Sequence, residues 1–336
     1  MFRPASNPPS RFEELHVTWD AEAPPARLRV YDDDTRGILA KNESPDIPFT
    51  WSVNPYRGCS HACIYCYARP SHEYLGFGAG TDFDTRILVK REAPRLLAEA
   101  FDAPSWQGER ILFSGNTDCY QPLEHRLGLT RGCLEVCARY RNPVSIITKS
   151  NLIERDVALI AGLAQPRVTV SIPYFDPALA RAIEPGAPTP ARRLRALRTL
   201  SSAGIAVGVN VAPVIPGVND KEIPAVLKAA REAGARWAGI ITVRLPGPVA
   251  PYFEQRLAEA LPLRAASVMA RIRRARDGKL NDPRFGSRMK GTGEEWEATQ
   301  QLFDVWTKKL GYEPWVRDDG PSPFRRPGEG RQMRLL

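Results

Sequence analysis

Long apolar runs are missing from this sequence, and cysteine is scarce. No segment approaches the roughly 18 consecutive apolar residues that a membrane-spanning helix requires, and residues 1–10 contain no apolar core of a secretory signal. Only 6 cysteines occur among 336 residues, too few for a secreted disulfide scaffold. We therefore expect a cytoplasmic protein with no membrane partner, whose cysteines serve metal or redox chemistry.

A strong compositional bias is also absent. Hydrophobic residues make up 43% of the chain and charged residues 25%, which excludes disordered and collagen-like classes. The length allows one large domain or two modest ones. The net charge of +9 is unevenly distributed, with many cations near the C-terminus. These cations are Arg264, Arg271, Arg273, Arg274, Arg276, Lys279, Arg284, Arg288 and Lys290, followed by Arg325, Arg326, Arg331 and Arg334.

Short runs rich in β-branched residues alternate with helical patterns through the middle of the chain. The predicted strands are 49–53, 110–114, 144–149, 167–172, 206–214 and 237–245. The predicted helices between them are 93–101, 129–140, 154–163, 191–203 and 223–233. This alternation indicates βαβ units and a parallel sheet, either open or closed into an incomplete barrel. Functional groups should then gather at the carboxyl ends of the strands.

Two flanking segments differ from this pattern. Residues 1–45 are rich in proline, aspartate and arginine without periodicity, which predicts an extended or partly ordered arm. Residues 46–250 form the predicted α/β domain. Residues 251–336 form a basic helical segment, because helical patterns recur there without strands.

The most specific pattern directly follows the first predicted strand. Cys59, Cys63 and Cys66 are close enough in sequence to converge on one metal centre from a single loop, and Gly58 allows a sharp turn at its entry. Three cysteines leave a structural zinc site one ligand short, and His61 would complete it only awkwardly from inside so tight a loop. A [4Fe–4S] cluster fits better, because three thiolates leave its fourth iron open for a substrate or cofactor.

The pattern Cys-x-x-x-Cys-x-x-Cys after the first strand of an α/β barrel resembles the radical S-adenosylmethionine (SAM) superfamily. The wider sequence at 54–70, 148–150 and 212–220 is similar to the branch related to spore photoproduct lyase. The resemblance covers roughly residues 48–289. It implies a partial (β/α)6 TIM-type barrel with an N-terminal arm and a C-terminal helical segment.

The resemblance also implies a cofactor and a reaction. The methionyl amine and carboxylate of SAM would chelate the open iron of a [4Fe–4S] cluster. One electron from a donor such as flavodoxin or ferredoxin would cleave the sulfonium C–S bond, giving methionine and a 5′-deoxyadenosyl radical. This radical abstracts a hydrogen atom from the substrate, while the protein orients the reactants and excludes water.

Residue roles near the cysteines follow from the same resemblance. Cys59, Cys63 and Cys66 match the three cluster ligands. Tyr65 matches the aromatic position that lies along adenine, and Tyr67 matches the tyrosine that follows the third cysteine. Tyr67 is therefore a candidate catalytic residue.

The turn after the second predicted strand departs from the family pattern. The superfamily usually has a Gly-Gly-Glu-like turn here that receives the methionine amine, whereas this chain has Gly-Asn-Thr-Asp from Gly115 to Asp118. Either the backbone of Asn116 and Thr117 or the carboxylate of Asp118 would make this contact.

The remaining cofactor positions lie on later strands. Lys149 matches a lysine that meets the SAM carboxylate in the lyase branch, and Ser171 suits a ribose hydroxyl. Asn210 and Val211 occupy positions of adenine and ribose contacts. Short polar residues at strand ends also commonly cap helices, which is the second interpretation of Ser171, Asn210 and Asp118.

Three cysteines lie outside the loop. In spore photoproduct lyase a cysteine near the second-strand turn donates hydrogen to a product radical, and Cys119 is the candidate for that role at a slightly different offset. Cys133 and Cys137 share one helix face at i and i+4. With Cys119 they would form either an auxiliary cluster or, as is usual for helical cysteines, small buried side chains.

Three functions remain open at this point. The first is a radical enzyme acting on a nucleic acid, favoured by the lyase branch and by the basic C-terminal region, where Arg273 and Arg276 are the pair expected to act together. The second is a radical enzyme acting on a peptide or small metabolite. The third is a non-enzymatic iron–sulfur or zinc module. The basic region is equally well explained as a solvated helix face.

Overall fold

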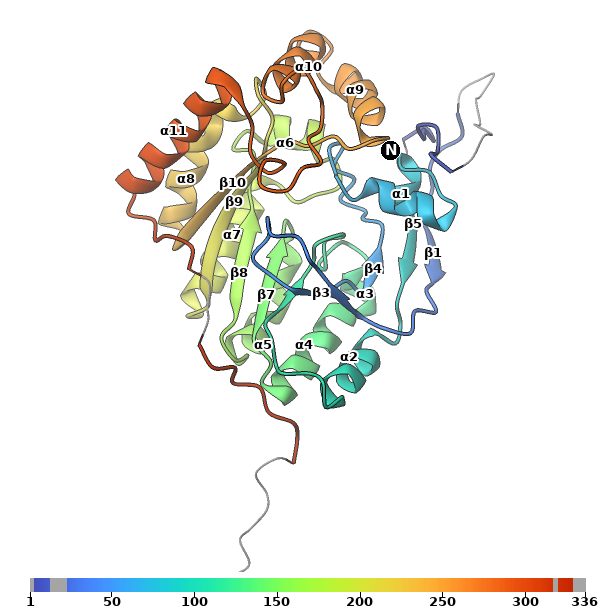
Figure 1. Cartoon of the computed structure of the whole chain (residues 1–336), viewed down its shortest axis with the longest axis vertical. Coiled ribbons are helices and arrows are strands. Elements are labelled where there is room, and N and C mark those ends of the chain that lie inside the picture. The colour runs from blue at the N-terminus through green and yellow to red at the C-terminus, as the bar shows by residue number, and fades with distance from the viewer. Residues whose placement is uncertain (1–2, 13–22, 317–319, 329–336) are drawn as a thin grey trace, which may run out of the picture.

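The centre of the molecule is a curved seven-stranded sheet with the strand order β10-β9-β8-β7-β6-β3-β2 (Figure 1). The computed structural model describes residues 3–12, 23–316 and 320–328. The strands are β2 (Leu39–Lys41), β3 (Trp51–Val53), β6 (Ile111–Phe113), β7 (Val144–Thr148), β8 (Arg167–Ser171), β9 (Ala206–Val214) and β10 (Trp237–Thr242). From β3 to β10 every neighbouring pair is parallel, and β2 pairs antiparallel with β3. The predicted parallel α/β sheet of a partial barrel is confirmed.

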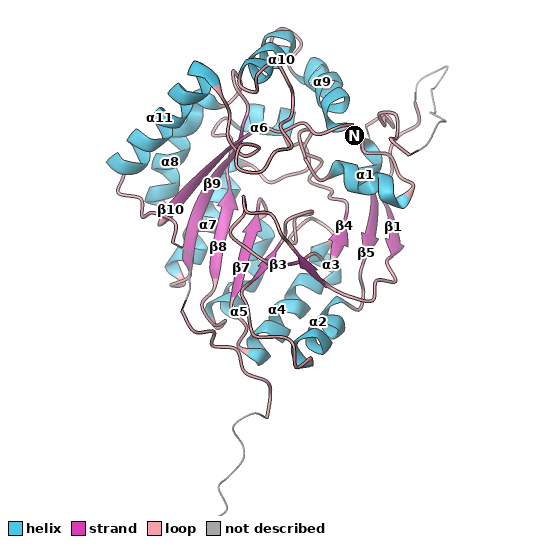
Figure 2. Ribbon diagram, in the orientation of Figure 1, coloured by secondary structure: helices cyan, strands magenta, loops and turns pink. Residues whose placement is uncertain are grey.

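Helices cover the outer face of this sheet (Figure 2). They are α2 (Ala93–Asp102), α4 (Leu129–Tyr140), α5 (Val157–Ala161), α7 (Pro190–Ser202) and α8 (Ile223–Glu232). Strand residues such as Phe113, Ile146 and Val209 are buried against them in one large core. Because successive strand residues point to opposite faces, the intervening residues, among them Ile147 and Thr169, face the inside of the barrel.

The N-terminal arm contributes to two sheets. Its strand β1 (Arg29–Asp32) pairs parallel with β5 (Arg86–Val89), which also pairs antiparallel with β4 (Tyr56–Arg57) to form a three-stranded sheet. Strand β2 of the same arm extends the main sheet. These short strands form because partners distant in sequence complete their backbone hydrogen bonds, a context that local periodicity does not reveal.

Short helices connect the larger elements at the ends of the sheet. They are η1 (Arg69–Leu75), α1 (Thr81–Thr85), α3 (Glu124–Leu127), η2 (Asn151–Asp156), α6 (Pro177–Ile183) and η3 (Asp220–Glu222). The arrowheads of β7 and β8 point toward the end of the molecule where α6 lies (Figure 1). This carboxyl end of the sheet is where functional groups of such folds gather.

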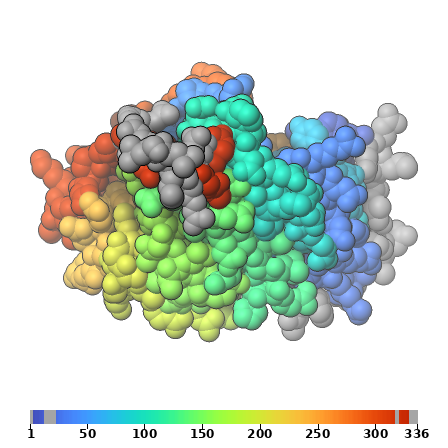
Figure 3. Space-filling view, turned by 90° about the horizontal axis from the view of Figure 1, so that it is seen from below, coloured from blue at the N-terminus to red at the C-terminus, as the bar shows by residue number. Residues whose placement is uncertain are grey.

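The C-terminal segment is helical, as predicted. It contains α9 (Val249–Ala260), α10 (Ala265–Arg274) and α11 (Gly293–Lys309), and no strand follows β10 among the described residues. Beyond α11 the chain returns to the barrel, where the ring of Phe324 lies 5.8 Å from Phe101. Figure 3 shows this red segment against the green and teal part of the molecule. Within the described residues, every helix is too short or too polar to cross a bilayer.

Candidate functional site

The cysteine loop lies between β4 and η1, and a glycine shapes its entry. Gly58 has a φ of +83°, a conformation that L side chains rarely adopt. A Cβ atom at this position would lie 2.8 Å from the carbonyl oxygen of Phe83 and 2.9 Å from the ring of His72. Only glycine fits this turn, as the sequence predicts.

Buried hydrogen bonds fix the loop after this turn. The backbone N–H of Cys59 donates to the carbonyl of Phe83 at 2.9 Å, and the fully buried guanidinium of Arg69 donates to the carbonyl of Cys63 at 2.8 Å. Arg69 also pairs with Asp84 at 2.8 Å. A buried ion pair with additional backbone hydrogen bonds holds its partners in one geometry. The loop backbone is thus defined by its surroundings.

The three thiols of this loop form no disulfide bond, and each is buried or half-buried. Cys59 and Cys63 are each 8% exposed, and Cys66 is half-buried. Burial raises the pKa of the Cys63 thiol to about 12, with Glu184 acting in the same direction and the charge of Lys149 opposing them. Iron and other thiophilic metals bind the thiolate form, so loading the site releases protons.

The donor set fits an iron–sulfur cluster better than zinc. The Nδ1 atom of His61 lies 3.4 Å from the Asp118 carboxylate, so the fourth zinc ligand considered from the sequence is engaged elsewhere. Among residues 3–12, 23–316 and 320–328, no three His, Cys, Asp or Glu side chains are arranged to hold a single metal ion. A cubane cluster is bound differently, because each thiolate ligates a separate iron.

Asp118 links the turn after β6 to the end of β7. Its carboxylate accepts hydrogen bonds from the Thr148 hydroxyl at 2.6 Å and from the Lys149 backbone N–H at 2.7 Å. Burial alone would raise the pKa of Asp118, but the ring of His61 and these hydrogen bonds outweigh it and hold the pKa well below its usual range. Asp118 therefore positions Lys149 and the cysteine loop together.

The rest of the turn after β6 is held by the segment that precedes the cysteine loop. The backbone N–H of Asn116 donates to the side chain of Asn54 at 3.2 Å, and the hydroxyl of Thr117 donates to the carbonyl of Tyr56 at 3.0 Å. The backbone of Asn116 and the carboxylate of Asp118 are thus both engaged in fixing the turn.

Lys149 and Tyr65 lie beside each other at the cysteine loop. The Lys149 ammonium is 5.9 Å from the centre of the Tyr65 ring. The hydroxyl of Tyr65 donates to Glu184, which also pairs with Arg193. Burial alone would lower the pKa of Lys149, but the charges of Cys63 and Glu184 outweigh it and raise the pKa, so the side chain stays cationic.

Sequence reasoning did not assign the Glu184–Arg193 pair to the site. Both residues are buried, and the carboxylate and guanidinium come from the ends of different helices, α6 and α7. In the sequence both are ordinary charged residues beside helix boundaries. Glu184 is 119 positions away from Tyr65, the tyrosine that it contacts. No local pattern identifies such a partner.

Tyr67 lies at the open side of the same loop. Its side chain is 49% exposed, and its hydroxyl donates to the carbonyl of Gly115 in the turn after β6. The guanidinium of Arg244 is 5.2 Å from the centre of its ring. Tyr65 and Tyr67 therefore face different surroundings, one a buried carboxylate and the other a half-buried cation.

The residues on β8 and β9 that the sequence predicts to contact SAM lie on both faces of the sheet. Ser171 and Asn210 are register partners on neighbouring strands. Asn210 borders a cavity of about 520 Å³ inside the barrel, whose lining also includes Thr169 and Trp237. Val211 points the other way and is buried in the core beneath the helices. Because adjacent strand residues face opposite sides, only the backbone of Val211 is left for the predicted contact with adenine or ribose.

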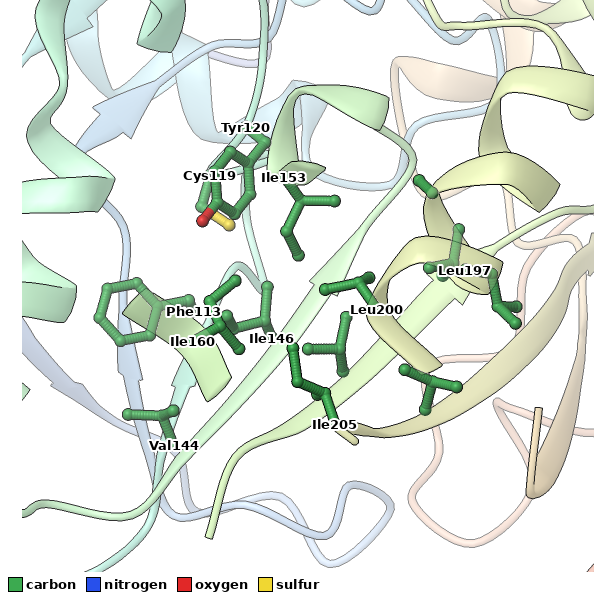
Figure 4. Close-up of a cluster of buried hydrophobic side chains, with 14 of the residues drawn as sticks. Phe113, Cys119, Tyr120, Val144, Ile146, Ile153, Ile160, Leu197, Leu200 and Ile205 are labelled. Atoms are coloured by element: carbon green, nitrogen blue, oxygen red, sulfur yellow. The ribbon is translucent and has the colours of Figure 1, made fainter. Parts of the chain in front are cut away.

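Cys119 does not lie at the mouth of the barrel. Its side chain is completely buried, and Figure 4 shows it in the apolar core with Tyr120 and Ile153. Burial raises the pKa of its thiol well above the usual value, so it stays protonated, and the side chain has no exposed surface in this structure. The predicted role as a hydrogen donor is wrong. Cys133 and Cys137 are buried in this same core and pack as small apolar side chains.

The basic C-terminal region is largely committed to internal contacts. Arg276 is only 4% exposed and donates to the backbone carbonyl of Val243 at 2.8 Å, so pairing it with Arg273 on a phosphate backbone is wrong. Arg271 and Arg274 both pair with Glu295 on α11. The exposed cations of this region include Arg273, Lys279 and Arg284. Arg331 and Arg334 lie outside the described residues.

Comparisons with known proteins agree with this architecture. Residues 53–230 match the sequence model of the radical SAM superfamily. An uncharacterised protein of Mycobacterium tuberculosis is 41% identical over 231 residues, 66% of this chain and 68% of that protein. Another, from Methanocaldococcus jannaschii, is 33% identical over 170 residues, covering 51% of this chain and 62% of that protein.

A solved structure shares the fold across most of the chain. Spore photoproduct lyase complexed with dinucleoside spore photoproduct superposes with a TM-score of 0.60. The superposition covers 84% of this chain and 80% of the lyase, with 16% sequence identity. At this identity the likeness concerns the arrangement of strands and helices.

Proposed function

The chain belongs to the radical SAM superfamily, and on that premise we propose that Cys59, Cys63 and Cys66 hold the [4Fe–4S] cluster that the family implies. The observation that carries this proposal is a single loop with three free thiols, held by buried hydrogen bonds at the carboxyl end of a partial barrel. Such a donor set leaves one iron without a protein ligand. SAM is the molecule that the family binds at this position.

The residues around the loop would bind and orient SAM. Cluster and SAM together supply an electron and a 5′-deoxyadenosyl radical when bound. Lys149, a half-buried cation beside the thiols, would pair with the SAM carboxylate. Tyr65 offers its ring to adenine, with its hydroxyl held by Glu184. Ser171 and Asn210 offer polar groups for the ribose and adenine on the neighbouring strands.

Tyr67 is the remaining candidate for direct contact with the substrate. Its ring lies next to the third cysteine in sequence and is half exposed, and its hydroxyl is oriented by the carbonyl of Gly115. The sequence predicts two catalytic residues, Tyr67 and Cys119. Cys119 is buried in the core, whereas a substrate can reach the side chain of Tyr67.

We propose a nucleic acid as the substrate and a cytoplasmic flavodoxin or ferredoxin as the electron donor. Support for the substrate comes from the shared fold with spore photoproduct lyase, a protein solved with a dinucleoside spore photoproduct. Exposed cations on the C-terminal segment, such as Arg273 and Lys279, would meet phosphates. The fold alone does not determine the substrate, so this part of the proposal needs its own test.

The cavity inside the barrel supports a second candidate, a small metabolite or a peptide side chain. Its volume of about 520 Å³ suits a small ligand. The lining combines apolar groups such as Trp237 and Ile147 with polar ones such as Thr169 and Asn210. Asn210, one of the proposed SAM contacts, is part of this lining.

Isotope transfer distinguishes these substrates. Reconstituted, reduced protein would be incubated anaerobically with unlabelled SAM and with deuterated DNA, RNA, peptide or metabolite pools prepared from cells grown in D₂O. We expect deuterium in 5′-deoxyadenosine only with a nucleic-acid pool. If deuterium is transferred only from the metabolite or peptide pool, the nucleic acid is rejected as the substrate, and the small metabolite or peptide side chain takes its place. The Cys59→Ala/Cys63→Ala/Cys66→Ala protein serves as the control for background cleavage.

A further inference from the structure

Arg244 is half-buried and has no hydrogen-bond acceptor among the described residues. It follows the end of β10 at the carboxyl edge of the sheet, where its guanidinium lies 5.2 Å from the centre of the Tyr67 ring. Within the described ranges, no carboxylate, hydroxyl or carbonyl group accepts a hydrogen bond from this guanidinium. A guanidinium carries five N–H donors, and those of Arg244 remain within reach of solvent, so an acceptor that enters the site can use them.

The neighbouring arginines differ from Arg244 because each has acceptors within the protein. Arg288 pairs with the carboxylate of Asp46 at 2.5 Å. Arg276 donates to the carbonyls of Val243 and Thr242 at the end of β10, and to those of Arg288 and Lys290 in the following loop. Arg276 thereby joins the strand end that carries Arg244 to the loop that carries Arg288.

The local charge is therefore positive in front of the cysteine loop. Burial, and the like charge of Arg288, lower the pKa of Arg244, while Tyr67 and Asp46 act in the opposite direction. Burial and the charge of Arg244 in turn lower the pKa of Arg276 to about 10. Asp46 is already paired with Arg288, so it does not neutralise Arg244. An oxyanion would satisfy the free donors and the excess charge together.

We propose that Arg244 binds an oxyanion of the substrate, a phosphate group, and so holds the substrate against Tyr67. The anion site stands on the geometry of Arg244, and the assignment of its ligand to the substrate rests on the proposed function. The two cations at the loop are separated by their tyrosines, with Lys149 beside Tyr65 and Arg244 beside Tyr67. We assign the SAM carboxylate to Lys149 and the substrate phosphate to Arg244.

The anion site is tested by soaking crystals of the cluster-loaded protein with tungstate, a tetrahedral dianion that anomalous diffraction locates. We expect a tungsten peak within hydrogen-bond distance of the Arg244 guanidinium. Arg198→Gln, which removes an exposed arginine from α7 on the outer surface, should keep this peak, and Arg244→Gln should lose it. Absence of the peak from the unchanged protein, or its retention in Arg244→Gln, would overturn the proposal.

A solution experiment separates the substrate from SAM as the source of the anion. In Arg244→Gln we expect binding of the trinucleotide d(TpTpT) at low salt to weaken by about tenfold, the loss of one charge-assisted hydrogen-bonded pair. SAM affinity should change by less than about twofold, because Lys149 still meets its carboxylate. Weaker SAM binding with unchanged trinucleotide binding would contradict the assignment.

The same variants distinguish failure of this inference from failure of the proposed function. Arg198→Gln should form 5′-deoxyadenosine from SAM without substrate at the rate of the unchanged protein. If the unchanged protein forms none, the proposed function fails, and the tungstate result still decides the anion site. Arg244→Lys should recover part of the trinucleotide affinity, because it restores the charge without the planar fork.

Discussion

Individual charges around the cysteine loop determine where its neighbours lie. Asp118 joins His61 to the end of β7, and Glu184 joins Tyr65 to Arg193. These carboxylates are satisfied by protein donors, so they act as positioning residues. In the described part of the chain, no carboxylate pairs with the side chains of Lys149 and Arg244, so these two cations can meet anionic ligands.

Lys149 should contribute to SAM affinity without supporting the cluster. A lysine paired with a carboxylate in a partly desolvated site contributes about 1.5–3 kcal/mol, so Lys149→Ala should weaken SAM binding roughly ten- to a hundredfold. Equilibrium dialysis with the cluster-loaded protein measures this, with iron content as the check on the cluster. Lys308→Ala, on the exposed face of α11, is the matched control. An unchanged SAM dissociation constant with an intact cluster would remove Lys149 from the site.

Asp118 should stabilise the fold in a pH-dependent manner. Its pKa in the folded protein lies below the unfolded value of about 3.9. Its contribution is therefore fully present above about pH 4 and is lost as the pH falls through the folded pKa. Urea unfolding of the apoprotein should show Asp118→Asn as less stable at pH 7, with the difference shrinking toward pH 3. A difference that is the same at both pH values would contradict this origin.

At the scale of elements, the sequence predicts the strands of the barrel well. It predicts poorly the ion pairs and hydrogen bonds that hold the loops between them. The runs 144–148 and 206–214 are rich in β-branched residues because helices bury one of their faces. The orientation of a single side chain is a finer property, since a shift of one residue reverses its face, as between Asn210 and Val211 on β9. Cys119 lies in the turn after β6, where strand periodicity does not apply, and its burial depends on packing between distant segments. Pairs such as Arg69–Asp84 depend on folding and leave no periodic pattern.

Gly58 should be essential to the cysteine loop for two separable reasons. Gly58→Ala places a Cβ atom against Phe83 and His72 in addition to a positive φ. Gly76→Ala meets only the φ strain, because no atom lies within 4 Å of its Cβ position. We expect Gly76→Ala to lower the free energy of unfolding by about 1 kcal/mol. Gly58→Ala should lower it by the same amount plus about 1–3 kcal/mol for the steric clash. Urea unfolding and iron content measure both variants, and equal losses would refute the steric argument.

Arg69 should be the main anchor of the same loop. Arg69→Met removes the donors to the Cys63 carbonyl and leaves Asp84 with fewer partners in a buried position. Breaking such a pair costs about 3–5 kcal/mol. The double variant Arg69→Met/Asp84→Asn removes the uncompensated charge and should recover part of this loss in urea unfolding. Additive losses would show that the pair does not act as a unit.

At the scale of the whole molecule, the exposed cations should produce salt-dependent binding of nucleic acids. Each phosphate neutralised by the protein releases counterions, so affinity for DNA or RNA should fall steeply as salt rises. Arg273→Glu/Lys279→Glu should lower both the affinity and its salt dependence, whereas Arg271 and Arg274 are engaged with Glu295 and Arg284 with Asp282. Fluorescence anisotropy with single-stranded and duplex oligonucleotides measures this, and salt-insensitive binding would move the search to small metabolites.

The central claim is that one loop holds a single [4Fe–4S] cluster that enables reductive cleavage of SAM. Anaerobically reconstituted protein should contain about four irons and four sulfides per chain, and with dithionite and SAM it should form 5′-deoxyadenosine. The Cys59→Ala/Cys63→Ala/Cys66→Ala protein should lose the iron and the product together. An unchanged protein with a full cluster that forms no 5′-deoxyadenosine, or a triple variant that retains its iron, would contradict the account.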